Sequence, residues 1–225
     1  MFDPVRNLCR RHFVCPDHRG QGSRSTDTGP LHLERLAEDV IELIEDLDRP
    51  VHLVGSSMGA YVAMIVAAEC PDLVRTTVWS AATADRESRP ELFASFADRF
   101  RAAQGDERGR LVAELMFGQE FLNSGAPLFK HWTAKFSRHT TDVLASADAV
   151  FARTDLWRHV ERVRCPVRLM SGRHDVAKST ADMQRIADAI DTEPPIEFPR
   201  SGHTPFVEEP HRMAQALKEF WSKYE

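Results

Sequence analysis

The first third of the chain alternates between short apolar runs and longer stretches with helical spacing. Val51–Val54 and Leu73–Trp79 are brief runs rich in β-branched residues, which is typical of buried strands, and His12–Cys15 has the same character. Leu31–Asp46 repeats leucine, valine and isoleucine at helical spacing, and Met58–Glu69 is an alanine-rich run without a helix breaker. Strands that alternate with helices predict a parallel sheet with right-handed crossovers.

The pattern changes in the middle of the chain. No convincing strand is found from Asp85 to His159, and glycines interrupt a series of stretches with helical spacing. The helices predicted there are Pro90–Ala103, Asp106–Phe121, Pro127–Ser137 and Thr141–Trp157. Most of their many aromatic rings should pack the helices against one another. An insertion between two strands also sits over the carboxyl edge of the sheet, so we expect Trp79, Phe117 and Trp132 to line a pocket.

The last part of the chain returns to the alternating pattern of the first. The remaining predicted elements are strands at Cys165–Met170 and Pro195–Phe198 and helices at Phe2–Arg11, Thr180–Ile190 and Pro210–Tyr224. The sequence therefore predicts an α/β fold in which a mostly parallel sheet has helices on both faces and carries a helical cap insertion. We expect residues 1–84 and 160–225 to form the α/β core and residues 85–159 to form the cap.

Composition and charge narrow the classes of function. The 225 residues include 29 basic and 34 acidic side chains, a net charge of −5, and no basic cluster with interleaved aromatic residues, which argues against a nucleic-acid partner. No apolar run reaches the length of a membrane span and no secretory signal opens the chain, so we expect no membrane association. The four scattered cysteines are typical of a reducing cytoplasm. Neither the cysteines nor the histidines show metal-ligand spacing, and we expect no metal and no cofactor.

The segment Gly55-Ser56-Ser57-Met58-Gly59 matches the G-x-S-x-G nucleophile elbow. The predicted strand before it and the predicted helix after it are the setting in which this elbow occurs. The turn is tight and needs small residues around the serine, a role that we expect Gly55 and Gly59 to fill. Ser57 would then present its hydroxyl at the carboxyl edge of the sheet, where open α/β sheets bind ligands. A packed strand–helix turn without a catalytic role is the alternative interpretation.

A serine hydroxyl needs a base within hydrogen-bond reach, and the base needs a carboxylate to orient it. Asp175 lies in the loop after the Cys165–Met170 strand, and His203 lies in the loop after the last strand. With Ser57 they give the order Ser, Asp, His that the elbow-containing fold uses. We expect His203 to accept the Ser57 proton, Asp175 to orient His203, and the Met58 backbone N–H to stabilise the oxyanion. A loop or capping carboxylate is the alternative role of Asp175.

Other residues compete for these roles. Asp85 follows a strand and is the alternative acid, and Ser56 is the hydroxyl beside the motif centre. His174 and His211 are alternatives for the base, although His174 precedes the predicted acid and His211 lies inside a predicted helix.

The polar loop after the His12–Cys15 run is broken by two glycines. It begins with Asp17 and contains Arg19. We expect both side chains to brace the loop through local hydrogen bonds and to take no part in catalysis.

Four segments together resemble the α/β-hydrolase family and, within it, the serine hydrolases with a helical cap. They are Asp17-His18-Arg19-Gly20-Gln21-Gly22-Ser23-Arg24-Ser25, Gly55-Ser56-Ser57-Met58-Gly59, Gly172-Arg173-His174-Asp175 and Ser201-Gly202-His203. The resemblance covers essentially the whole chain, and the region from elbow to cap looks most like 3-oxoadipate enol-lactonases and related small esterases. Members of similar sequence include carboxylesterases, lactonases, C–C bond hydrolases, cofactor-free haloperoxidases and hormone receptors, so the resemblance does not define a substrate.

The sequence departs from that family at its beginning. The family usually starts with additional strands and a His-Gly loop that supplies the second oxyanion N–H. Phe2-Asp3-Pro4 resembles the residues just after that loop, so we expect the strands and the loop to be missing, including the strand beside Val51–Val54. Three explanations compete: a chain start placed too late, which we favour, a rearranged sheet, or a partner chain that fills the gap. An open sheet edge favours association, which leaves a homo-oligomer open.

The sequence therefore predicts a cytoplasmic serine hydrolase that cleaves a small-molecule ester or lactone through an acyl-enzyme. A low-turnover ligand-binding or receptor-like module is the alternative, because losing one oxyanion donor costs about 10²–10³ in rate. A C–C bond hydrolase or a perhydrolase on the same triad is a further alternative.

Overall fold

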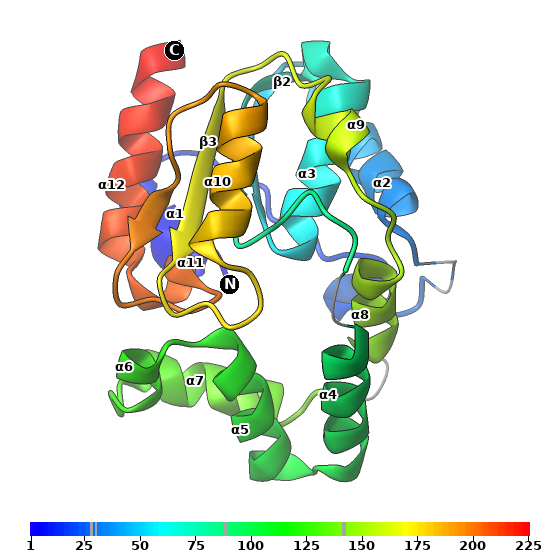
Figure 1. The fold of residues 1–225 in the computed structure, drawn as a ribbon, viewed down its shortest axis with the longest axis vertical. Coiled ribbons are helices and arrows are strands. Elements are labelled where there is room, and N and C mark those ends of the chain that lie inside the picture. The colour runs from blue at the N-terminus through cyan, green and yellow to red at the C-terminus, as the bar shows by residue number, and fades with distance from the viewer. Residues whose placement is uncertain (28, 30, 88–89, 141–142) are drawn as a thin grey trace.

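The computed structural model describes residues 1–225 except 28, 30, 88–89 and 141–142 (Figure 1). At its centre, the described residues form a parallel sheet of four strands in the order β1-β2-β3-β4. The strands are β1 (Val51–Ser56), β2 (Val74–Ser80), β3 (Val167–Gly172) and β4 (Ile196–Phe198). Because all four run in the same direction, the loops that follow them lie at one edge of the sheet.

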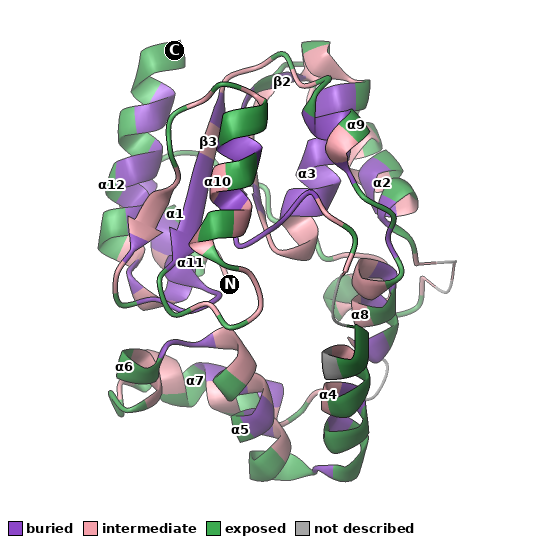
Figure 2. Cartoon of the chain, in the orientation of Figure 1, coloured by how far each residue is buried: buried purple, intermediate pink, exposed green. Residues whose placement is uncertain are grey.

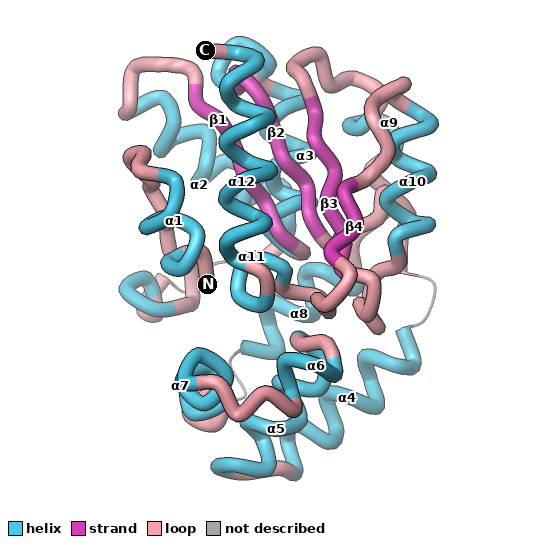
Figure 3. Tube along the Cα trace, turned by 90° about the vertical axis from the view of Figure 1, so that its left-hand side faces the viewer, coloured by secondary structure: helices cyan, strands magenta, loops and turns pink. Residues whose placement is uncertain are grey.

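Helices cover both faces of this sheet (Figure 3). One face packs against α2 (Leu33–Asp46), α3 (Met58–Glu69), α9 (Trp157–Val160) and α10 (Thr180–Ala189), and the other against α1 (Asp3–Cys9), α11 (Pro205–Glu208) and α12 (Pro210–Trp221). Successive residues of a strand point to opposite faces, so Trp79 packs with the first group and Val78 with the second. A sheet that is buried on both faces needs strands that are almost continuously apolar. This is why these strands could be predicted from the sequence.

A further group of helices lies between β2 and β3 in the chain. It comprises α4 (Pro90–Ala102), α5 (Gly105–Met116), α6 (Gln119–Leu122), α7 (Pro127–Phe136) and α8 (Val143–Phe151). In Figure 1, α4 to α7 lie beyond the end of the sheet toward which the arrow of β3 points. The absence of strands between residues 85 and 159 is confirmed for the part of that range that the structure describes. This group therefore stands over the carboxyl edge of the sheet, as an insertion at this point should.

The two connections between the sheet and these helices run side by side. The Leu156 N–H donates to the Ala84 carbonyl at 2.7 Å. Nη2 of Arg153 donates to the Asp85 carbonyl at 2.8 Å, and Nε1 of Trp157 donates to Oδ1 of Asp85 at 3.0 Å. The inserted helices thus leave the core and return to it at one place.

Three sequence predictions in this part of the fold need correction, and the first concerns His12–Cys15. These residues do not form a strand. The Phe13 ring packs edge-on against Trp221 of α12, with 5.9 Å between ring centroids. An apolar stretch with strand propensity forms a strand only where a neighbouring strand can pair with it, and here the stretch packs through its side chain instead.

The other two corrections concern long predicted helices that are each two helices. The predicted helix Asp106–Phe121 breaks at Phe117, which is extended (φ −119°, ψ 146°), so that its ring enters an aromatic cluster with Phe121 and Phe136. The predicted helix Thr141–Trp157 begins outside the described residues, and its described part is split between α8 and α9 by the return to the core. The other predicted helices and strands are confirmed, with ends that differ by up to three residues.

The strand that precedes the predicted nucleophile, β1, lies at one edge of the sheet and pairs with β2. Nδ1 of His52 in β1 lies 2.8 Å from the Thr76 hydroxyl in β2, which adds a side-chain link to the backbone pairing. The expected loss of a strand beside β1 stays a prediction. Across the described residues, none of the helices combines the length and the hydropathy needed to cross a bilayer.

Candidate active site

The elbow is a sharp turn between β1 and α3. Ser57 has φ 53° and ψ −120°, a conformation that residues with a side chain rarely adopt. Its N–H donates to the Ser80 carbonyl at 2.9 Å, which ties the turn to the end of β2. A Cβ atom on Gly55 would lie 2.1 Å from the Gly59 carbonyl oxygen, so the start of α3 passes directly over Gly55. The turn therefore requires glycine at position 55.

The second glycine of the motif behaves differently. A Cβ atom on Gly59 would meet no atom within 4 Å among the described residues. The need for a small residue on both sides of the serine is therefore not imposed by packing at Gly59, because the first turn of α3 is open on that side outside its own backbone. The Cβ test thus separates the two motif glycines, which the sequence pattern treats alike.

The amino end of α3 offers donors beside the serine. Ser57 is the N-cap residue and Met58 is the first residue of the helix. The first N–H groups of a helix have no acceptor within it and carry the positive end of the helix dipole. The Met58 N–H is thus available to an oxyanion formed at Ser57, as predicted from the motif, and this role stays a prediction.

The predicted acid and base lie in contact. Nδ1 of His203 is 2.8 Å from Oδ2 of Asp175, and Oδ1 of Asp175 accepts the backbone N–H groups of Ala177 and Lys178 at 2.8 and 2.9 Å. The Asp175 side chain is fully buried and His203 is 5% exposed. A carboxylate with these partners can only accept, so Nδ1 of His203 donates and Nε2 is left to accept a proton.

The sheet brings the nucleophile to the same edge as this pair. Ser57 follows β1, Asp175 follows β3 and His203 follows β4, and the strands are parallel. Among the hydrogen bonds between described residues, none joins the Ser57 hydroxyl to His203. Contacts between a nucleophile and its base are often long in the absence of substrate, so the pairing of Ser57 with His203 stays a prediction.

The rival acid has a different set of partners. Burial opposes ionisation of Asp85, but hydrogen bonds from Trp157 and Arg185 hold the pKa of its carboxyl below the usual range. These partners join the returning chain and α10 to the loop after β2. Asp85 is thus engaged at the base of the cap helices, and its contacts do not include a histidine in the described structure.

The remaining alternatives take no part in the hydrogen bond between Asp175 and His203. His174 and His211 are exposed, and His211 lies in α12 as predicted. Ser56 is the last residue of β1, opposite Ser80 of β2.

The glycine-broken loop is braced in two ways. Oδ2 of Asp17 accepts the Ser23 N–H at 2.8 Å and the Ser23 hydroxyl at 2.9 Å, which confirms the local hydrogen bonds predicted for it. Arg19 instead reaches α2, where its Nε lies 2.8 Å from Oδ2 of Asp39. The prediction of a purely local role is therefore wrong for Arg19, because a nearly buried carboxylate on the adjacent helix offers it a stronger partner.

The predicted pocket residues are all deeply buried. Trp79 is inaccessible and packs in the core beside α3, while Phe117 and Trp132 pack with Phe136 and Val207 in a cluster between the cap helices and α11. The indole N–H groups of Trp79 and Trp132 have no hydrogen-bond partner among the described residues. Their burial is compatible with the wall of a closed pocket and with simple packing, so lining a substrate pocket stays a prediction.

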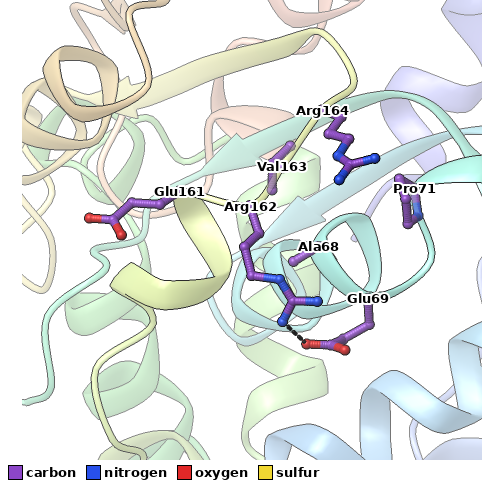
Figure 4. A pocket seen from close by; sticks show the side chains of 7 residues that line it. All are labelled: Ala68, Glu69, Pro71, Glu161, Arg162, Val163 and Arg164. Carbon is purple, nitrogen blue, oxygen red and sulfur yellow. Dashed lines mark hydrogen bonds and ion pairs between the residues drawn. The ribbon is translucent and has the colours of Figure 1, made fainter.

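A pocket of about 430 Å³ is found at the opposite end of α3 (Figure 4). It is lined by Ala68, Glu69, Pro71, Glu161, Arg162, Val163 and Arg164, with an ion pair of 2.9 Å between Arg162 and Glu69. The twelve residues of α3 separate it from Ser57 by about 18 Å. This pocket is therefore not the predicted substrate site. Within the described chain, no three or more His, Cys, Asp or Glu side chains are grouped so that they could hold a metal ion.

Two acids beside His203 are not predicted from the sequence. The loop that carries His203 leads into the one-turn helix α11, which ends in Glu208 and is followed by Glu209. Both carboxylates accept hydrogen bonds from the loop that carries His203. The available signal was a pair of acids directly after the apolar Phe206-Val207, which is too weak to single out from sequence alone.

A model described as "Alpha/beta hydrolase family" matches residues 1–216 of the chain. The chain belongs to this family. Family membership agrees with the parallel sheet that has helices on both faces. It also confirms the family resemblance and the α/β-hydrolase fold expected from the four sequence segments.

Relatives of this α/β-hydrolase include named enzymes. It is 24% identical over 216 residues to 3-oxoadipate enol-lactonase 2 of Acinetobacter baylyi, covering 95% of this chain and 80% of that protein. It is 26% identical over 221 residues to pimeloyl-[acyl-carrier protein] methyl ester esterase of Sodalis glossinidius, covering 94% and 82%. The enol-lactonase structure from Burkholderia xenovorans LB400 superposes with a TM-score of 0.85 at 23% identity, covering 98% of this chain and 85% of that one. That structural likeness shows the shared fold.

The names of these relatives bear on the expected type of enzyme. They describe a lactonase and an esterase, which confirms the expectation of a hydrolase acting on ester bonds at the level of the family. The roles of Ser57, Asp175 and His203 stay predictions.

Proposed function

We propose that this α/β-hydrolase is a serine hydrolase that cleaves a small carboxylic ester or lactone through an acyl-enzyme. The observation that carries the proposal is the strained Ser57 at the same sheet edge as the hydrogen-bonded pair of Asp175 and His203. A nucleophile on a strained turn, a base with a free Nε2 and a buried carboxylate behind it are the three parts that acyl transfer requires.

The proposed reaction has two stages. Oγ of Ser57 attacks the carbonyl carbon while Nε2 of His203 takes its proton, and the Met58 N–H stabilises the resulting oxyanion. The C–O bond of the ester then breaks, and the leaving oxygen takes the proton back from His203. In the second stage His203 takes a proton from water and the hydroxide attacks the acyl carbon. The bond between that carbon and Oγ of Ser57 then breaks, Oγ takes the proton from His203, and the acid is released. Asp175 stays ionised and stabilises the imidazolium in both stages.

The proposal extends to the division of the chain. Residues 1–84 and 160–225 supply the catalytic groups, and residues 85–159 form the cap that holds the acyl or leaving group against them. Trp79, Phe117 and Trp132 are the proposed pocket residues. The similarity to a lactonase and a methyl ester esterase supports a small ester or lactone as the substrate.

Labelling with a fluorophosphonate tests the nucleophile. The wild-type chain should form a phosphonyl adduct on Ser57, and Ser57→Ala should not react. Ser56→Ala is the matched control, because it removes the neighbouring hydroxyl of the same motif and should keep the adduct. Intact-mass and peptide mass spectrometry locate the adduct. An adduct that persists in Ser57→Ala, or no adduct in a folded wild-type chain, would refute the proposal.

A low-turnover binding module is the second candidate. It is favoured because no hydrogen bond between described residues joins the Ser57 hydroxyl to His203, and because Met58 is the one oxyanion donor that we propose. Hydrolysis of p-nitrophenyl esters distinguishes the two, since turnover that disappears in Ser57→Ala excludes a purely binding role. A C–C bond hydrolase or a perhydrolase would use the same triad, and a substrate panel separates those reactions from ester cleavage.

A further inference from the structure

The loop that carries His203 is in direct backbone contact with the cap helices. A Cβ atom on Gly202 would lie 2.5 Å from the backbone nitrogen of Gly118, which precedes α6. The His203 N–H donates to the Met116 carbonyl at 3.1 Å, and the Thr204 hydroxyl donates to the same oxygen at 3.1 Å. The segment between α5 and α6 therefore touches the residues on both sides of the proposed base.

The same loop is pressed against the acid side of the site. A Cβ atom on Gly172, the last residue of β3, would lie 1.9 Å from the Gly202 carbonyl oxygen. Three backbone segments thus meet at Gly202: the end of β3, the histidine loop and the cap residue Gly118. Such close packing leaves little freedom for one segment to move without the others.

The carboxylate of Glu208 joins two of these segments. Its Oε2 accepts the Gly118 N–H at 2.7 Å, and its Oε1 accepts the Gly202 N–H at 2.9 Å and the Thr204 N–H at 3.2 Å. Within the described structure, no lysine, arginine or histidine forms an ion pair with Glu208. The charge is balanced by backbone donors from the cap on one oxygen and from the histidine loop on the other.

We propose that Glu208 is a positioning residue for His203, which locks the cap segment Met116–Gly118 to the histidine loop and thereby orients the imidazole toward Ser57. The proposal rests on the proposed function. Asp175 fixes Nδ1 of the ring, but the direction of Nε2 also depends on the backbone of residues 202–204, which Glu208 holds. A displacement of a catalytic group by about 1 Å can lower a rate by about 10²-fold.

Glu209 provides a matched control. It is 5% exposed and serves the same loop, because its Oε1 accepts the Arg200 N–H at 3.0 Å and the Ser201 hydroxyl at 2.8 Å. It also pairs with the Arg200 side chain at 3.7 Å. The described hydrogen bonds of Glu209 do not reach the cap. Glu208→Gln and Glu209→Gln therefore make the same chemical change in one loop, with and without the link to the cap.

A second variant acts from the cap side. Gly118→Ala would place a Cβ atom 2.9 Å from the Gly202 nitrogen and 3.0 Å from the Arg200 carbonyl oxygen. Gly118 has φ −70° and ψ 157°, which alanine adopts without strain, so the change acts only by pushing the cap from the loop. It tests the same contact without altering the carboxylate, in case Glu208→Gln does not fold.

Two readouts report on His203 without knowledge of the substrate. The first is the rate constant for fluorophosphonate labelling of Ser57. The second is the downfield proton resonance of the His203 Nδ1–H that donates to Asp175. Glu208→Gln and Gly118→Ala should slow labelling about 10- to 100-fold and shift or broaden the resonance, while Glu209→Gln should stay within about threefold of wild type. A merely structural role would lower the melting temperature and leave both readouts of the folded protein unchanged.

The outcomes separate the two proposals. Wild-type labelling rates and an unchanged resonance in folded Glu208→Gln or Gly118→Ala would overturn the role of Glu208, as would an equal loss in Glu209→Gln. If Ser57 of the wild-type chain is not labelled, the proposed function fails, and the resonance alone still decides whether Glu208 orients His203.

Discussion

The two halves of the proposed site are built in different ways. The nucleophile half is a local structure: its strained φ at Ser57 and the close approach of Gly59 to Gly55 arise within a few residues of one turn. The acid–base half depends on contacts between distant parts of the chain. His203 meets Asp175 across 28 residues, and Glu208 meets Gly118 across 90.

This difference shows which half can respond to the cap. The elbow is set by backbone sterics and the packing of α3, in which nine residues are buried. In Figure 2, β3 and much of α3 are buried, whereas much of α4 is exposed. The histidine loop contacts the segment between α5 and α6, so we expect movement of the cap to reach His203 before it reaches Ser57.

The largest expected effect comes from breaking the acid–base half at its centre. Asp175→Asn keeps the shape of the side chain but offers an amide that no longer stabilises the imidazolium or selects the Nδ1–H tautomer of His203. We expect kcat for a p-nitrophenyl ester to fall about 10⁴-fold, equivalent to about 5 kcal/mol of activation free energy. Asp85→Asn, at the rival acid, should retain kcat in the folded protein. A larger loss in Asp85→Asn would assign the acid to the loop after β2.

The next largest effect is expected from a steric clash with the backbone of the nucleophile half. Gly55→Ala would place a methyl group 2.1 Å from the Gly59 carbonyl oxygen, and we expect it to lower the free energy of unfolding by about 3 kcal/mol or more. Gly59→Ala meets open space and lies in a helix, so it should be neutral or stabilise by up to about 1 kcal/mol. Urea denaturation compares the two. Equal destabilisation by Gly55→Ala and Gly59→Ala would show that neither position has space for a methyl group.

The smallest effect concerns the pH dependence of stability on the histidine side. Burial raises the pKa of Glu208, against the lowering effect of hydrogen bonds from Gly118, Gly202 and Thr204. Because the folded pKa lies above the ordinary value of 4.5, the folded chain binds more protons than the unfolded chain in that window. The contribution of Glu208 to stability is then complete below pH 4.5 and declines as the pH rises through the folded pKa.

Urea denaturation between pH 4 and 8 measures this contribution as the difference in unfolding free energy between wild type and Glu208→Gln. We expect the unfolding free energy of the wild type to fall relative to that of Glu208→Gln as the pH rises. A shift in favour of the wild type would mean that the hydrogen bonds outweigh burial.

The sequence predicts the two halves unequally well, for the same physical reason. The bounds of α3 and the place of Ser57 follow from local spacing and glycines, and the structure agrees with the predicted helix at both ends. Asp175 and His203 could be proposed from their order along the chain, because parallel strands bring such loops to one edge. The role of Glu208 could not be proposed from the sequence, since it depends on a contact with Gly118 that no local sequence pattern predicts.

The errors have a similar origin. His12–Cys15 has the side chains of a strand, but a strand also needs a partner, and the partner is a property of the whole sheet. The break at Phe117 arises because a ring is drawn into a cluster built by other helices. Local propensity does not predict either of these long-range contacts.

The side-by-side connections at Ala84 and Leu156 have an evolutionary consequence. A segment whose two attachment points are neighbours can be lengthened, shortened or exchanged without altering the register of the strands that flank it. A family could therefore diversify its specificity by replacing this one module while inheriting the hydrolytic machinery intact.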